Sequence, residues 1–106
     1  MNKKILIIDT TDRGKIKVGV KINGETTFVS SSATILKSQA TLPLIEKILE
    51  EKGIDIKDLD EIEVNTGPGS FTGIRVGVSI GNALSYLLQI PINGKRIGQL
   101  AEPVYN

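Results

Sequence analysis

The sequence predicts a single α/β domain of 106 residues with the element order βββαβαβ. Three observations support this prediction. The first third of the chain contains alternating or continuous apolar runs, the period becomes helical near residue 38, and a glycine-rich turn near residue 67 leads into a second helix. A chain of this length buries only somewhat over 60% of its unfolded surface. We therefore expect one core with a thin margin of stability.

The first three strands are expected to form an antiparallel meander. Residues 4–9 contain a continuous apolar run, Ile5 to Ile8, between Lys4 and Asp9, which is typical of a central strand. Residues 15–22 alternate lysine with isoleucine or valine, as a half-exposed strand does. The Asn23-Gly24 pair is a strong hairpin signal and predicts a return strand over residues 25–31.

The first helix is expected from about residue 38, with Ser38 or Thr41 as N-cap, Pro43 in its opening turn and Gly53 at its end. Its apolar residues cover an arc of about 160°, which indicates more burial than one sheet face provides. A polar connection over residues 55–61 should follow. The remaining strands are expected at residues 62–65 and 90–92.

The second helix is notable for glycine. Gly73, Gly77 and Gly81 recur at four-residue intervals and are followed by Ser85. Three glycines inside a helix cost about 2–3 kcal/mol relative to alanine. One interpretation is that they bring the helix close to the chain's own sheet. We favour a second chain packed on this stripe, because the other sides of the helix are also apolar.

The composition excludes several kinds of site. The chain has no cysteine and no histidine, so disulfides, thiolate catalysis, imidazole bases and the common zinc sites are excluded. Thirteen basic and twelve acidic residues form no basic run, which argues against direct nucleic-acid binding by this chain alone. Its N-terminal apolar run is too short for a signal peptide, and Arg75, Asn82 and Gln89 interrupt the glycine helix. We expect a cytoplasmic protein without a membrane span.

Two motifs resemble the bacterial TsaB (YeaZ) family of tRNA threonylcarbamoyladenosine biosynthesis subunits. The first is Ile8-Asp9-Thr10-Thr11, after the first strand. The second is the long run Asn-Thr-Gly-Pro-Gly-Ser-Phe-Thr-Gly-Ile-Arg-Val-Gly over residues 65–77. Leu42-Pro43-Leu44-Ile45 also fits the family pattern. The resemblance extends from residue 3 to about residue 96 and covers one of the family's two lobes.

The resemblance implies a single ribonuclease-H-like lobe of the actin-like ATPase type, with a mixed five-stranded sheet and two main helices. This lobe would occupy residues 1–96, and residues 97–106 would be a C-terminal tail. We interpret the missing second lobe as natural internal shortening. Where family members carry a histidine near the first helix, this chain has Lys37-Ser38, and the metal-binding histidine pair of the catalytic relatives is absent. We expect neither a metal site nor a cofactor.

The family's function implies a non-catalytic scaffold or activating subunit. It would pair with a TsaD-like catalytic subunit, and possibly a TsaE-like ATPase, in threonylcarbamoylation of tRNA adenosine 37, and would form a homodimer in isolation. The alternatives are a homodimeric remnant outside the tRNA pathway and an ATPase or glycoprotease-like enzyme. No nucleophile and base can be paired from these residues for the enzyme. The expected interface residues are Leu42, Ile45, Leu49, Gly73, Ile74, Gly77, Ile80, Gly81, Leu84 and Ser85.

Three polar features remain open to two interpretations each. Asp9, Thr10 and Thr11 would occupy the phosphate-binding hairpin of actin-like ATPases, and such residues also satisfy their own turn. We favour the turn and treat the phosphate site as vestigial. Residues 67–70 could cradle an anion, although a tight turn with Ser70 or Thr72 as N-cap is favoured. Arg75 would form a salt bridge across the interface or be solvated at its edge.

Overall fold

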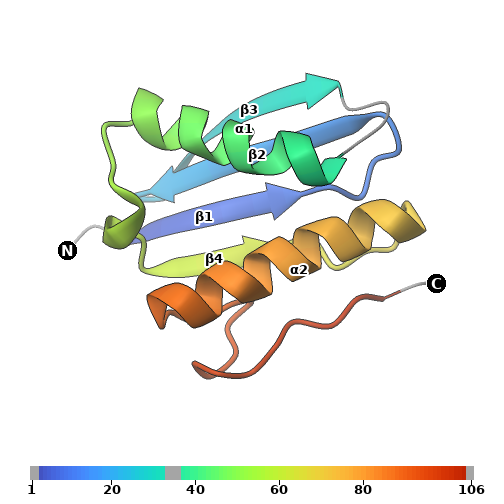
Figure 1. Ribbon diagram of the computed structural model, residues 1–106. Helices are drawn as coiled ribbons and strands as arrows, with labels where there is room; N and C mark the ends of the chain where they lie inside the picture. Colours follow the sequence, from blue (N-terminus) through green and yellow to red (C-terminus); the bar gives the residue numbers. More distant parts are fainter. Residues whose placement is uncertain (1–2, 33–36, 105–106) are drawn as a thin grey trace.

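The structure is a computed structural model that describes residues 3–32 and 37–104, and it places two helices on one face of a four-stranded sheet (Figure 1). The strand order is β3-β2-β1-β4. The first three strands pair antiparallel, and β4 runs parallel to β1. The elements are β1 (Lys4–Asp9), β2 (Lys15–Ile22), β3 (Glu25–Ser32), α1 (Lys37–Glu51), η1 (Ile56–Asp58), β4 (Glu61–Val64) and α2 (Phe71–Leu88).

The predicted meander and hairpin are confirmed. Asn23 and Gly24 form the two-residue turn between β2 and β3, and both have positive φ, at 55° and 78°. That combination belongs to a type I′ turn, whose twist matches that of the flanking strands. The hairpin register therefore follows from two residues of sequence.

A fifth strand was predicted over residues 90–92, but the structure has only a single bridge there and a sheet of four strands. One parallel bridge joins Ile62 to Ile92. The Ile62 N–H donates to the Pro91 carbonyl at 2.9 Å, and the Asn93 N–H donates to the Ile62 carbonyl at 2.9 Å. Pro91 has no N–H to give to a ladder, and Asn93 turns the chain with a φ of 51°. The pairing therefore ends after one bridge.

The side chain of Asn93 takes the place of further backbone pairing. Its Oδ1 accepts the N–H of Val64 at 2.8 Å, and its Nδ2 donates to the carbonyl of Val64 at 3.0 Å. One amide side chain thus satisfies both backbone groups that a longer fifth strand would have bonded.

The first helix begins earlier than predicted. Ser38 and Thr41 both lie inside α1, so neither is its N-cap, and Pro43 falls beyond the opening turn. Thr41 is buried, and its hydroxyl donates to the carbonyl of Lys37 at 2.7 Å. The C-terminal prediction is confirmed, because Gly53 follows the helix with a φ of 64° and donates its N–H to Glu50 at 3.1 Å.

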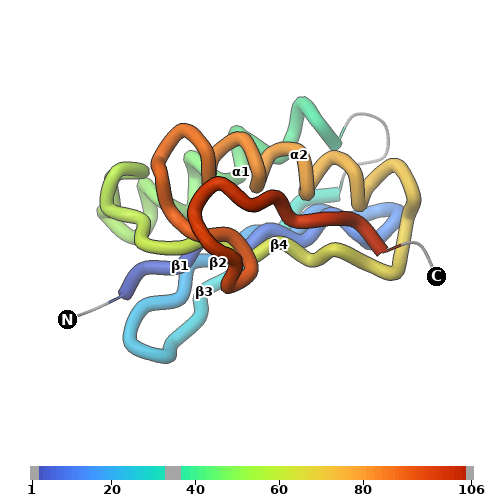
Figure 2. Tube along the Cα trace, turned by 90° about the horizontal axis from the view of Figure 1, so that it is seen from below, coloured from blue at the N-terminus to red at the C-terminus, as the bar shows by residue number. Residues whose placement is uncertain are grey.

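The core lies between the helices and the sheet face they cover. Alternate strand residues are buried there, namely Leu6, Ile8, Ile16, Val18, Val20, Ile62 and Val64. Figure 2 shows both helices on the same side of the sheet. No described helix covers the other face, which we call the open sheet face. Its residues are Ile5, Ile7, Asp9, Lys15, Lys17, Gly19, Lys21, Thr26, Phe28, Ser30, Ser32, Glu61 and Glu63.

Residues 97–104, expected as a tail, pack along α2. Ala101 is buried, and its N–H and carbonyl both bond the side chain of Asn82, at 2.8 and 3.1 Å. The Val104 N–H donates to the carbonyl of Thr66 at 2.7 Å. This segment therefore ties α2 to the loop that precedes it. Neither helix among the described residues is long and apolar enough to cross a membrane.

Candidate functional site

The glycine stripe of α2 faces the chain's own sheet. Gly73, Gly77 and Gly81 are all buried. A methyl group on Gly73 would overlap the carbonyl of Thr10, and one on Gly77 would overlap the Thr10 hydroxyl. On Gly81 it would lie 3.0 Å from the tip of Ile92. The favoured interpretation, a second chain packed on this stripe, is therefore wrong, and the alternative of close packing within the chain is confirmed.

The loop after β1 is the element that fills the glycine groove. Thr10 is completely buried, and its hydroxyl donates to the carbonyl of Gly73. The Ser70 N–H donates to the Thr11 carbonyl at 2.7 Å. Ser70 is the N-cap of α2, as predicted, and its hydroxyl accepts the N–H of Gly73 at 3.2 Å. The glycine-rich turn and the Asp9 loop therefore form one packed unit.

Asp9 directs its carboxylate into its own turn. Oδ1 accepts the Thr11 N–H at 3.0 Å and the Thr11 hydroxyl at 2.7 Å, and Oδ2 accepts the Asn65 amide at 3.1 Å. Burial alone would raise the pKa of Asp9. The bonds from Thr11 and Asn65 and the nearby charge of Lys17 outweigh burial, so the pKa lies below its usual 3.8.

Asp9→Asn should flatten the acid limb of the stability curve. The folded Asp9 stays ionised below pH 3.8, where the unfolded chain takes up the proton. Stability is therefore lost as the pH falls from 3.8 through the lower folded-state pKa. Urea unfolding at neutral pH and near pH 3 measures the difference, which should be smaller in the variant. An equal loss in wild type and variant would show that Asp9 titrates normally.

Lys37 is a buried cation at the start of α1. Its ammonium donates to the carbonyl of Thr10 at 2.8 Å and to the carbonyl of Asp12. The residue is only 8% exposed. Burial lowers the pKa of Lys37, and the carboxylates of Asp12 and Asp9 partly oppose that shift. Three segments thus meet at one ammonium, because Lys37 Nζ also lies beside Gly73.

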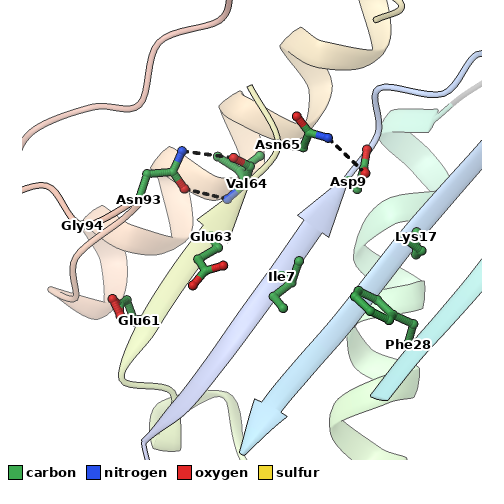
Figure 3. A pocket seen from close by; sticks show the side chains of 10 residues that line it. All are labelled: Ile7, Asp9, Lys17, Phe28, Glu61, Glu63, Val64, Asn65, Asn93 and Gly94. Atoms are coloured by element: carbon green, nitrogen blue, oxygen red, sulfur yellow. Dashed lines mark hydrogen bonds between the residues drawn. The ribbon is translucent and has the colours of Figure 1, made fainter. Parts of the chain in front are cut away.

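A hollow of about 560 Å³ lies on the open sheet face (Figure 3). Ile7 and Phe28 contribute its apolar lining, and Lys17 lies 4.6 Å from the centre of the Phe28 ring. Glu63 lines the opposite side. Within the described ranges, no three His, Cys, Asp or Glu side chains are grouped so as to hold a metal ion. The hollow combines an apolar floor with charges of opposite sign on its two sides.

Comparison with known proteins decides the family. The family model described as TsaD, tRNA N6-adenosine threonylcarbamoyltransferase, matches residues 28–94, more than half of the chain. TsaB proteins are similar to this chain: that of Haemophilus influenzae is 32% identical over 91 residues, 86% of this chain, and that of Bacillus subtilis is 31% identical over 116 positions, 96% of this chain. The chain belongs to the TsaB (YeaZ) branch of this family.

The structural comparison agrees with the TsaB assignment. YeaZ from Pseudomonas aeruginosa superimposes with a TM-score of 0.80 and 26% identity, over 89% of this chain and 44% of that one. This likeness confirms the predicted α/β lobe in all but its fifth strand. The chain spans 38% of the Haemophilus TsaB and 49% of the Bacillus TsaB, so it corresponds to less than half the length of these relatives.

Most of the predicted interface lies inside this TsaB-family lobe. Besides the three glycines, Ile45, Leu49, Ile74 and Ser85 are buried, so these seven positions are unavailable to a partner. Ser85 instead donates its hydroxyl to the Ile90 carbonyl at 2.6 Å. The wide apolar arc of α1 is buried within the chain because α1 packs on β2, β3 and α2.

The remaining residues of the predicted interface are not fully buried. Leu42 is 47% exposed on α1, and Ile80 and Leu84 are half-buried on α2. The sequence prediction omitted Leu87, which is 73% exposed and shares a stripe with Ile80 and Leu84 at helical spacing. The helical spacing from Ile80 and Leu84 could have predicted Leu87 from the sequence. We call Leu42, Ile80, Leu84 and Leu87 the outer helix surface.

Arg75 lies on the exposed side of α2. Its guanidinium carbon is 5.7 Å from the centre of the Phe71 ring, one turn earlier. This distance is within the range of a cation–π contact. The ring therefore offers Arg75 a contact in its own helix, in addition to the two roles considered from the sequence.

Proposed function

We propose that this TsaB-family lobe is a non-catalytic subunit in tRNA threonylcarbamoyladenosine biosynthesis. It would pair with a TsaD-like catalytic subunit that modifies tRNA adenosine 37, in the cytoplasm, with a TsaE-like ATPase as a possible further component. The observation that carries this proposal is the outer helix surface, on which leucines are exposed in a lobe related to both TsaB and TsaD. The Nitrosospira multiformis protein named tRNA N6-adenosine threonylcarbamoyltransferase is 42% identical over 53 residues, half of this chain and 15% of its own length.

The exposed leucines supply the driving force for pairing. Complete burial of one leucine side chain stabilises by about 1.5–3 kcal/mol. Leu42 and Leu87 lie on two different helices and are 47% and 73% exposed. Because Ile80 and Leu84 already contact the core, a partner docked here would extend that core outward. Pairing through α1 and α2 thus remains the proposal, with side chains in place of the glycine stripe.

The hydrogen bonds of the Asp9 loop support a non-catalytic role. Asp9 accepts three bonds within the chain, and Lys37 donates to two carbonyls. Both groups are held by the fold, whereas a catalytic base or phosphate ligand must face its substrate. We therefore assign this loop the task of holding α1 and α2 in place for the partner.

Leu87→Glu should weaken binding to the TsaD-like subunit of the same organism by about 10- to 100-fold. The substitution places a carboxylate in the proposed contact while leaving the buried side of α2 unchanged. Isothermal titration calorimetry measures the affinity, and light scattering after size exclusion gives the stoichiometry. Ile97→Glu is the matched control, since Ile97 is 53% exposed but lies outside both helices.

Unchanged affinity in Leu87→Glu, with wild-type melting behaviour, would exclude the outer helix surface as the contact. A wild-type chain that ignores the TsaD-like subunit at micromolar concentration would contradict the proposed function itself. That outcome would favour a family remnant outside the tRNA pathway.

A further inference from the structure

We propose that Asn23 is a site of spontaneous deamidation and that the fold protects Asn93 from the same reaction. Asn23-Gly24 and Asn93-Gly94 are the two Asn-Gly pairs of the chain. Both form turns of the same kind, with φ angles of 55° and 78° in the first pair and 51° and 73° in the second. The backbones of the two turns are therefore matched, and the surroundings of the two asparagine side chains differ.

The reaction is favoured in Asn-Gly pairs because glycine has no side chain to block the approach to its backbone nitrogen. That nitrogen loses its proton to hydroxide and attacks the side-chain carbonyl carbon, Cγ, of the asparagine. The bond from Cγ to the side-chain nitrogen breaks, and ammonia leaves after taking up a proton from water. A succinimide ring remains, which one water molecule opens at either carbonyl to give aspartate or isoaspartate. The asparagine side chain must be able to turn toward the glycine nitrogen for this to occur.

The side chain of Asn23 is not held in place. Asn23 and Gly24 are exposed at the tip of the hairpin formed by β2 and β3. Among the described residues, none makes a hydrogen bond with the amide of Asn23. The last strand pair before the turn joins Ile22, which is only partly buried, to the exposed Glu25. The tip can therefore open locally without exposing a fully buried side chain.

The side chain of Asn93 is held at both ends of its amide. Oδ1 accepts the N–H of Val64 at 2.8 Å and Nδ2 donates to its carbonyl at 3.0 Å, so Cγ cannot turn toward Gly94 unless both bonds break. The preceding residue, Ile92, is fully buried, and its carbonyl accepts the N–H of Lys95 at 3.0 Å. Opening of this turn therefore disturbs the core, and its free-energy cost is higher than at Asn23.

The products differ in their expected effect on the fold. Asp-Gly also suits a type I′ turn, so aspartate at position 23 should keep the hairpin. Isoaspartate adds one carbon atom to the backbone, so the two-residue turn and the pairing of Ile22 with Glu25 should be lost. At Asn93 even aspartate would be harmful, because a carboxylate cannot donate a hydrogen bond to the Val64 carbonyl. The fold thus protects the asparagine whose amide it needs.

Peptide mapping by mass spectrometry measures the two reactions. The full chain is incubated at mildly alkaline pH, both folded and unfolded in guanidinium chloride, and the tryptic peptides 22–37 and 76–95 report on Asn23 and Asn93. In the folded chain, Asn23 should convert at least about tenfold faster than Asn93. In the unfolded chain the two rates should agree within about threefold, because the contacts that hold Asn93 are gone.

The isolated product tests the effect on the hairpin. Ion exchange separates the converted chain, because deamidation removes its net charge of +1. Chains with isoaspartate at position 23 should melt at a lower temperature than the wild type. The variant Asn23→Asp is the matched control, since it carries the same charge on an ordinary backbone, and it should melt close to the wild type.

Three results would overturn the proposal. The first is a folded chain in which Asn93 converts as fast as Asn23 or faster. The second is a folded chain in which neither residue converts while the unfolded chain converts at both, because the turn itself would then protect Asn23. The third is a tenfold difference that persists in guanidinium chloride, which would assign the difference to neighbouring sequence and not to the fold. Isoaspartate chains that melt like Asn23→Asp would contradict the expected loss of the hairpin turn.

Discussion

Alanine in place of Gly73 should destabilise the domain by about 3 kcal/mol, although the same change in an exposed helix would stabilise it by up to about 1 kcal/mol. The added methyl group would overlap the backbone carbonyl of Thr10 and lie 2.7 Å from the ammonium of Lys37. A backbone carbonyl cannot rotate away as a side-chain tip can. The helix must therefore move off the sheet, at the expense of core contacts made by Ile74 and Val78.

The three glycines should respond in a graded order. Gly77→Ala should cost about 2 kcal/mol, since its methyl group meets a side-chain hydroxyl, and Gly81→Ala should cost least, since it meets the flexible tip of Ile92. Urea unfolding followed by circular dichroism gives the free energies. Ser79→Ala, at an exposed position of the same helix, is the control and should be neutral or slightly stabilising. Equal stability of all four variants would contradict the packing described for α2.

Lys37→Met should cost about 2 kcal/mol, mainly through the carbonyl of Thr10. Methionine keeps much of the length and apolar surface of the side chain but cannot donate a hydrogen bond. The Thr10 carbonyl is buried and would lose the bond from Lys37, whereas Asp12 is exposed and water can replace its bond. Relief of the buried charge offsets part of the cost. Urea unfolding is again the measurement, with the exposed Lys47→Met as control and an expected change within about 0.5 kcal/mol.

The pH dependence gives Lys37 a second signature. Because its pKa is lowered on folding, the unfolded chain binds this proton more tightly. Between the folded value and 10.5, the stability of the wild type should therefore rise with pH, relative to that of Lys37→Met. A difference between the two proteins that stays constant over the alkaline range would show that burial does not disfavour the charged form.

Features set by neighbouring residues were predictable from the sequence. The hairpin at Asn23-Gly24, the helix end at Gly53 and the cap at Ser70 each depend on the conformation of a few adjacent residues. The fifth strand failed for an equally local reason, because Pro91 and Asn93 stop a ladder that an apolar run alone would permit.

Contacts between residues far apart in the chain could not be predicted from the sequence. The glycine spacing shows that something approaches α2 closely, but it does not show what. The answer is Thr10, which is 63 residues away in the chain from Gly73. Lys37 similarly bonds carbonyls that are 25 and 27 residues away. The predicted interface was wrong at most positions for the same reason as the glycine stripe. A wide apolar arc in the sequence does not show whether a partner or the chain's own elements cover it.

The amide side chain of Asn93 also bears on aggregation. Bare backbone at the border of a sheet is a template on which a strand from another molecule can grow. On β4, the backbone N–H and carbonyl of Val64 are already bonded by the Asn93 amide, and Ile62 already pairs with Ile92. Among the described strands, β3 is then the edge strand that can still pair with an incoming strand. It ends in three serines, Ser30, Ser31 and Ser32. Fibril-like growth would have to start there, on polar residues with little to gain from it.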